Sequence, residues 1–142
     1  MTIKNCTSFV GLILLTTVLT FSSCSKKMRF QVSSVVPAAH GVVKVKKDNN
    51  KNYSISIHIT DLAAADRLTP PSRVYIVWMD AADVMSKNIG QIGSSGNLLS
   101  SRKKSSFQTV SSVMPTRIYI TAEDDPNTML PGAQVVLMTE SF

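Results

Sequence analysis

The segment Tyr53–Thr60, YSISIHIT, decides the fold of this chain. Every second position of it holds a large apolar residue, and serine, histidine and threonine fill the positions between. A period of two places all the large side chains on one face of an extended backbone. The segment is therefore predicted to be a β-strand with one buried face.

The residues just before this strand predict its partner. Val43 and Val45 alternate with Lys44 and Lys46, which indicates a second half-buried strand. The intervening segment 48–52, DNNKN, is rich in residues that tolerate a left-handed backbone. The two strands are therefore predicted to form an antiparallel hairpin.

Further strands are predicted on both sides of this hairpin, because short apolar segments recur between turn residues. The expected strands are 28–36, 73–79, 88–93, 107–113, 116–122 and 133–139. Segment 73–79, RVYIVWM, is almost continuously apolar and is expected to be covered on both faces. Segment 61–72 is expected to hold one or two helical turns, and the Gly/Ser-rich, basic segment 94–106 is expected to be a loop. Strands spaced at about 10 residues favour an all-β antiparallel sandwich of seven to eight short strands.

The first 24 residues, MTIKNCTSFVGLILLTTVLTFSSC, predict export. Lys4 is followed by the apolar run Phe9–Phe21 and then by Ser22 and Ser23, which is the order of a secretory signal. Cys24 comes directly after these small residues, and this placement resembles a bacterial lipobox, in which the cysteine is acylated and becomes the new N-terminus. The predicted organisation is a lipoprotein signal peptide over 1–23, a lipid-anchored tether over 24–27 and a β-sandwich domain over 28–142.

Two alternatives to lipidation stay open. A transmembrane anchor would need about 20 apolar residues, and the apolar run is shorter. An ordinary cleaved signal is the other alternative, and Phe21 stands where a lipobox usually has leucine. In the lipoprotein the mature domain of about 118 residues has no free thiol, because Cys6 leaves with the signal peptide and Cys24 carries the lipid. Thiol catalysis and cysteine-bound metals are therefore not expected.

The charge of the chain bears on its partners. The full chain has a formal net charge of +6, and ten of its 15 lysine and arginine residues fall in three groups, within 26–29, 44–51 and 102–104. The first group lies beside the anchor, where it either contacts anionic headgroups or serves as a solubilising tether. An exported, membrane-held domain is not expected to bind nucleic acid. Ser25 replaces the acidic residue associated with inner-membrane retention, so the expected location is the cell envelope, at the outer membrane facing the periplasm.

One part of the chain resembles a known family. The runs RVYIVWMDAADVMSKNIGQI, FQTV and TRIYITAEDDPNTMLPGAQVVLMTE, within 73–140, are similar to the extracytoplasmic C-terminal domain of anti-sigma-K-type factors. The resemblance implies an immunoglobulin-like β-sandwich. The cytoplasmic sigma-binding domain and membrane-spanning helix of those factors have no counterpart in this sequence, so the sigma-binding role is not expected here.

Glu123, Asp124 and Asp125 form the densest acidic group and are weak candidates for an interaction site. Loop carboxylates are ligands for Ca²⁺, but no D-x-D-x-D-G spacing accompanies them. An aspartate before Pro126 is more typical of turn formation. No metal and no cofactor are therefore expected.

The remaining polar residues do not form a catalytic pattern. His40 and His58 lie in different segments without a carboxylate placed beside them, and they are expected to be exposed. The sequence contains no G-x-S-x-G elbow and no glycine-rich phosphate loop, so no catalytic residue is assigned. Trp78 is expected to pack between the two sheets, as the core tryptophan of an immunoglobulin-type strand does.

These observations favour a non-catalytic envelope lipoprotein, held in the membrane through covalent lipid at Cys24 and either binding a protein or glycan or serving structurally. A sensory or regulatory module like the anti-sigma domain is the alternative, and a hydrolase or metal-handling protein is the least favoured.

Overall fold

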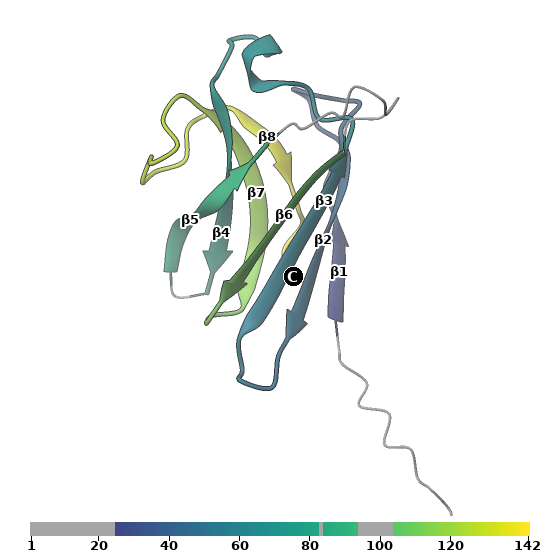
Figure 1. The fold of residues 1–142 in the computed structure, drawn as a ribbon, viewed down its shortest axis with the longest axis vertical. Coiled ribbons are helices and arrows are strands. Elements are labelled where there is room, and N and C mark those ends of the chain that lie inside the picture. The colour runs from purple at the N-terminus through teal and green to yellow at the C-terminus, as the bar shows by residue number, and fades with distance from the viewer. Residues whose placement is uncertain (1–24, 83, 94–103) are drawn as a thin grey trace, which may run out of the picture.

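The structure is a computed structural model that describes residues 25–82, 84–93 and 104–142. Cys24 and most of the predicted loop 94–106 lie outside the described residues. Within them the chain forms eight strands and one short 3₁₀ helix, η1 (Figure 1). The strands are β1 (Ser25–Arg29), β2 (His40–Lys47), β3 (Tyr53–Thr60), β4 (Val74–Ala81), β5 (Val84–Ile92), β6 (Lys104–Ser111), β7 (Pro115–Glu123) and β8 (Val135–Met138).

The strands form two antiparallel four-stranded sheets, in the orders β1-β2-β3-β6 and β5-β4-β7-β8. Figure 1 shows the two sheets packed as layers. The pairs β3–β6 and β4–β7 join strands that are distant in sequence, as the B–E and C–F pairs of the immunoglobulin fold do. The predicted all-β, immunoglobulin-like sandwich is therefore confirmed, with β1 as an additional edge strand beside β2.

The β2–β3 hairpin forms as its sequence predicts. Val43, Val45 and the three isoleucines of β3 are buried between the sheets. In the connecting loop, Asp48 Oδ1 accepts hydrogen bonds from the backbone N–H groups of Asn50 and Asn52, each at 2.8 Å. Lys51 adopts a φ of 66°, the left-handed conformation expected for this loop.

The first strand differs from its prediction. It spans Ser25–Arg29 rather than 28–36, and Ser25 pairs with Lys46, so the tether predicted for 24–27 overlaps a paired strand. Beyond Phe30 the chain turns away: Ser33 Oγ accepts hydrogen bonds from the backbone N–H groups of Val35 and Val36, and Val32 is 81% exposed. A serine that bonds its own backbone offers an alternative to the sheet, which ends the strand early.

Other boundaries shift by a few residues. The helical segment is a single turn, η1 (Ala65–Arg67), and β5 begins at Val84, well before the predicted start at 88. Gly90 lies at a bulge in β5 with a φ of 140°, where an added Cβ would lie 2.7 Å from the Phe107 ring. The close approach of the Phe107 ring and the positive φ therefore both require glycine at position 90. Gly93 faces open space instead.

The main core lies between the sheets. It includes alternate residues of β4, namely Tyr75, Val77 and Met79, packed with the valines and isoleucines of β2, β3 and β7. Among the described residues, no helix has the length and apolar character needed to cross a bilayer.

Candidate functional site

A second, smaller apolar cluster lies on the outer face of the β5-β4-β7-β8 sheet. Ile76, Trp78 and Tyr119 form it, and the Trp78 and Tyr119 rings stack with centroids 6.4 Å apart and planes 16° apart. Trp78 is fully buried, which confirms that it is a packing residue. The expectation that it lies between the sheets is wrong. Its neighbours Val77 and Met79 face the inter-sheet core, and strand alternation therefore turns Trp78 to the opposite face.

A chain of hydrogen bonds connects this cluster to the loop between β7 and β8. The indole N–H of Trp78 donates to Thr121 Oγ1 at 2.7 Å, and the Thr121 hydroxyl donates to Glu123 Oε1. The same carboxylate oxygen accepts the backbone N–H of Gly132 at 2.7 Å. Glu123 ends β7 and Gly132 follows nine residues later, so this set, here called the Glu123 clamp, holds the two ends of the loop together.

Gly132 is needed for this contact. A Cβ built at Gly132 would lie 2.7 Å from Glu123 Oε2 and 3.0 Å from Oε1, so a larger residue would push the carboxylate away. Thr121 is fully buried, and the indole N–H therefore has this hydroxyl in place of water as its acceptor. Because a buried donor without a partner costs free energy, the clamp fixes the positions of its members.

Asn88 makes a second attachment to the same loop. It is the cross-strand partner of Trp78, and its Nδ2 donates to the backbone carbonyls of Pro126 and Thr128 at 3.2 and 3.1 Å. Its Oδ1 accepts the backbone N–H of Gly90 at 3.0 Å. The side chain thus ties the bulge in β5 to the middle of the loop.

The acidic residues singled out in the sequence have separate roles. Glu123 belongs to the clamp, Asp124 is exposed, and Asp125 Oδ1 accepts the backbone N–H of Asn127 at 2.9 Å. The last contact confirms turn formation for Asp125. The carboxylates of Glu123 and Asp125 are bound to different parts of the loop and do not share a centre. Over residues 25–82, 84–93 and 104–142 no cluster of three metal-ligating side chains occurs.

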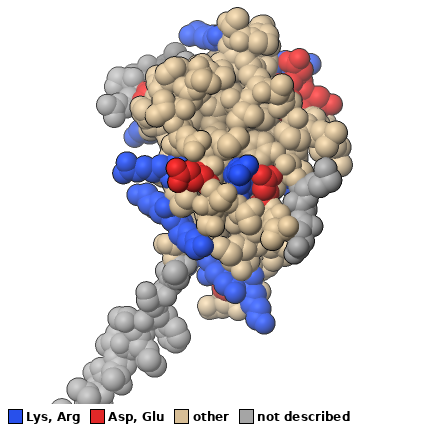
Figure 2. Space-filling view, turned by 180° about the vertical axis from the view of Figure 1, so that it is seen from behind, with Lys and Arg blue, Asp and Glu red and all other residues tan. Residues whose placement is uncertain are grey.

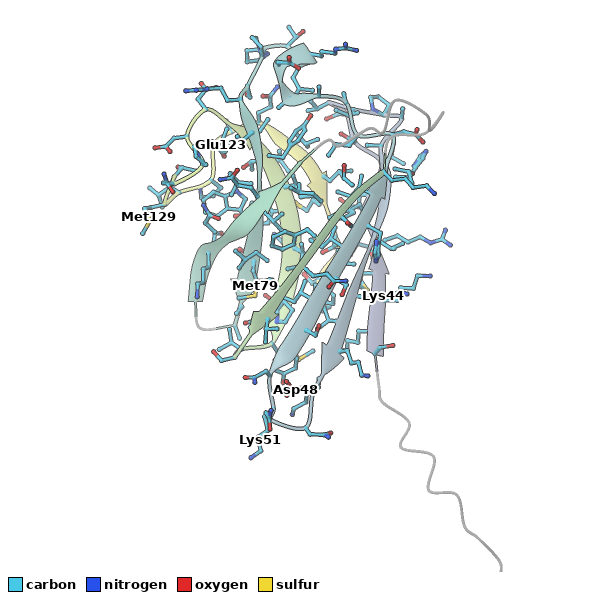
Figure 3. The ribbon with its side chains drawn as sticks, viewed as in Figure 1. Lys44, Asp48, Lys51, Met79, Glu123 and Met129 are labelled. Atoms are coloured by element: carbon cyan, nitrogen blue, oxygen red, sulfur yellow. The ribbon has the colours of Figure 1, made fainter. Side chains whose placement is uncertain are left out.

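The loop presents two apolar side chains to solvent. Met129 is 83% exposed and Leu130 is 68% exposed, and Figure 3 shows Met129 at the outer end of the loop, away from the body of the sheets. The Thr128 hydroxyl donates to the Leu130 carbonyl at 2.8 Å, which stiffens this Met129–Leu130 tip. A hollow of about 640 Å³ lies beside the tip, between residues 88–91 of β5 and residues 126–129 of the loop. Adjacent exposed large apolar residues are typical of interaction sites.

Two other hollows contain titratable groups. His40 and His58 line one of about 480 Å³ together with Arg29, and both histidines are exposed, as the sequence predicts. A second hollow of about 390 Å³ is lined by Tyr75 and Asp66. Burial, and then the nearby Asp66 charge, raises the pKa of Tyr75 to about 12, and the hydroxyl donates to the Ala63 carbonyl at 2.9 Å. Burial likewise raises the pKa of Tyr119.

The residues that build the loop attachments were missed in the sequence. Asn88, Thr121 and Gly132 form no motif, and their partners are 38, 43 and 9 positions away. The available signal was the TAE run of 121–123, in which alternation places threonine and glutamate on the face shared with Trp78.

Comparison of the chain with protein-family models, with curated proteins and with solved structures gave no match in any of the three.

Proposed function

We propose that this chain is a lipid-anchored, non-catalytic binding module of the bacterial cell envelope, which contacts a partner protein through the Met129–Leu130 tip. The observation that carries the proposal is an exposed apolar pair on a loop that is held at both ends by the Glu123 clamp and in its middle by Asn88.

The attachments favour binding because they lower its entropic cost. Ordering a backbone costs about 1–2 kcal/mol per residue, and a loop that is already fixed does not incur this cost when the partner arrives. Met129 adds an unbranched, polarizable side chain that adapts to an irregular partner surface.

The chemistry of the tip favours a protein over a glycan. The side chains of Met129 and Leu130 offer a thioether and an isobutyl group, which have no strong hydrogen-bonding capacity for sugar hydroxyls. The partner is therefore expected to supply an apolar pocket, as proteins do at their interfaces.

The anchoring part of the proposal is supported by the order of residues 1–24. Acyl chains at Cys24 would give stable attachment, since each buried methylene contributes about 0.8 kcal/mol. The arrangement of the fold fits such an anchor. Ser25, at the start of β1, pairs with Lys46 near the Asp48 loop at the lower end of the molecule, whereas Met129 lies on the opposite side, at the far left of Figure 3. A domain held at Ser25 would thus point its tip away from the membrane, here proposed to be the outer membrane facing the periplasm.

The segment that carries the clamp, 73–140, is also the segment that resembles the anti-sigma-K extracytoplasmic domain. A sensory or regulatory module is therefore the second candidate. Genomic neighbourhood distinguishes the two, because an adjacent sigma-factor gene would favour sensing.

The binding role is tested by placing a photo-reactive amino acid at position 129 in the membrane-bound protein. We expect discrete cross-linked products of defined mass, reduced several-fold by Leu130→Ser. The control is the same label at Val32, which is equally exposed but lies on a different loop. Identical products from positions 129 and 32, or none from position 129, would show that the tip is not a binding site.

A further inference from the structure

The two sheets differ sharply in charge. Every charged residue in the strands of the β1-β2-β3-β6 sheet is a lysine or an arginine. The strands of the other sheet combine Lys87 and Arg117 with Asp80 and Glu123. In Figure 2, lysine and arginine side chains gather along the side and the lower end of the molecule, close to where the described chain begins.

Strand register places four of these cations on one surface. Val43 and Val45 face the core, so Lys44 and Lys46 face outward from β2. Lys27 pairs with Lys44 and therefore faces outward too, followed on the same side of β1 by Arg29. These four residues are here called the basic face, and all of them are exposed.

The described strands that form this surface, β1, β2 and β3, contain no acidic residue. Lys27 and Lys44 lie directly opposite each other on neighbouring strands, an arrangement that is unfavourable for like charges. The outward neighbours on β3 are Ser54, Ser56 and His58. Within the described part of the chain, the ion pair that forms is Arg117 with Asp80 at 4.0 Å, on the other sheet. Because these cations repel one another, an anion that binds from outside the protein stabilises the surface.

The basic face starts where the proposed anchor ends. Ser25, the first residue of β1, is already paired with Lys46, so Cys24 directly precedes the sheet, at most about 3.8 Å from Ser25 between Cα atoms. Lys27 follows within three residues of Cys24, a reach of about 10 Å, which is comparable to the screening length at physiological salt. An acyl anchor at Cys24 would therefore hold Lys27, Lys44 and Lys46 against the headgroups.

We propose that the basic face of β1 and β2 docks on anionic phospholipid and fixes the orientation of the domain on the membrane. This orientation rests on the proposed anchor at Cys24, whereas the affinity of the face for anionic lipid is a property of the fold itself. An anionic membrane is the occupant that the position of residue 24 favours over a soluble anion, because the anchor brings that surface to the lysines.

The affinity is measured with residues 25–142, which contain both sheets and the core and carry no acyl chain. The probe is vesicles of phosphatidylglycerol and phosphatidylcholine, compared with phosphatidylcholine alone, at 0.1 M salt. A lysine near an anionic surface contributes about 1 kcal/mol, or about fivefold in partitioning. The triple variant Lys27→Gln, Lys44→Gln, Lys46→Gln is therefore expected to lose about a hundredfold. The matched control Arg67→Gln, Arg73→Gln, Lys87→Gln has the same net charge and is expected to lose a few-fold at most.

A single substitution tests whether a loss of vesicle binding could come from unfolding of the domain. Ser56→Glu places a carboxylate opposite Lys44, where an opposite-charge pair stabilises the sheet. We expect it to lower vesicle binding at least fivefold without lowering the melting temperature.

Three results would overturn the proposal: equal binding to neutral and anionic vesicles, equal losses in the two triple variants, or complete displacement from vesicles by soluble polyglutamate at the same anion concentration. None of them bears on acylation of Cys24, which is measured separately by mass, so failure of the anchor and failure of the docking face are distinguishable.

Discussion

Replacing Thr121 with valine removes the central hydroxyl of the Glu123 clamp and keeps the shape of the side chain. The hydroxyl accepts from the Trp78 indole and donates to Glu123, so valine leaves a fully buried N–H without an acceptor. An unsatisfied buried donor costs about 1–3 kcal/mol, and a lost hydrogen bond to a carboxylate costs about 1.5–3 kcal/mol. Water reaches the half-buried Glu123 and recovers part of the second cost, so the expected loss is about 2–4 kcal/mol.

A loss of that size is measurable without unfolding the domain, whose total stability is expected to be about 5–15 kcal/mol. For a chain of this length it corresponds to a fall of about 8–15 °C in the melting temperature. Trp78 is the one tryptophan of the sequence, so its fluorescence reports on the clamp while circular dichroism follows the whole fold. We expect the fluorescence maximum to shift in Thr121→Val even below the transition.

The control is Thr60→Val, at a strand position where the hydroxyl makes a long 3.4 Å contact at the surface. Surface substitutions of this kind change stability by at most about 0.5 kcal/mol. If Thr121→Val melts within about 2 °C of Thr60→Val, the hydrogen-bond chain does not hold the loop, and the reasoning that supports the Met129–Leu130 tip is wrong.

Three further results are expected. Gly132→Ala pushes the Glu123 carboxylate off the backbone and lowers stability by about 1–3 kcal/mol, measured by chemical denaturation; an unchanged midpoint would contradict it. Asn88→Ala frees two loop carbonyls and should increase amide hydrogen exchange at 127–130 more than in the core strands; uniform exchange would contradict it. The pKa of Tyr75 is about 12 in the folded protein and 10 in the unfolded chain. The protonated Tyr75 hydroxyl therefore contributes fully to the free energy of unfolding below pH 10, and this contribution is lost as the pH rises toward 12. The free energy of unfolding of the wild type should therefore fall by about 2–3 kcal/mol more than that of Tyr75→Phe between pH 10 and pH 12. Parallel curves of stability against pH for the two proteins would refute the assignment.

The parts of the fold that were predictable depend on local periodicity. The strand Tyr53–Thr60 and its hairpin with β2 follow from the alternation of apolar and polar residues and from the loop residues Asp48–Asn52. The other strands were predicted in the same way, from short apolar segments between turn residues. The position of β1 was missed because Lys26 and Lys27 read as a polar tether. An edge strand needs few apolar residues, since one side of its backbone faces solvent.

The candidate site was less accessible to sequence reasoning. Burial of Trp78 follows from its apolar strand, but the face on which it lies depends on how β4 pairs with β7, and that register is a long-range property. Glu123 was assigned to an acidic group with Asp124 and Asp125 because the three are adjacent. Its role is instead set by Gly132, whose closeness to the carboxylate appears only once the loop has folded back.

The central claim, that this fold is a module held at a membrane through Cys24, is tested most directly by intact-mass analysis of the protein from the membrane fraction of its own envelope. The account predicts loss of residues 1–23 and the added mass of two or three acyl chains on Cys24. A Cys24→Ala variant should lose both the acyl mass and the membrane association. A wild-type chain with an unmodified Cys24, or a Cys24→Ala variant still membrane-bound and cleaved at the same place, would contradict the claim.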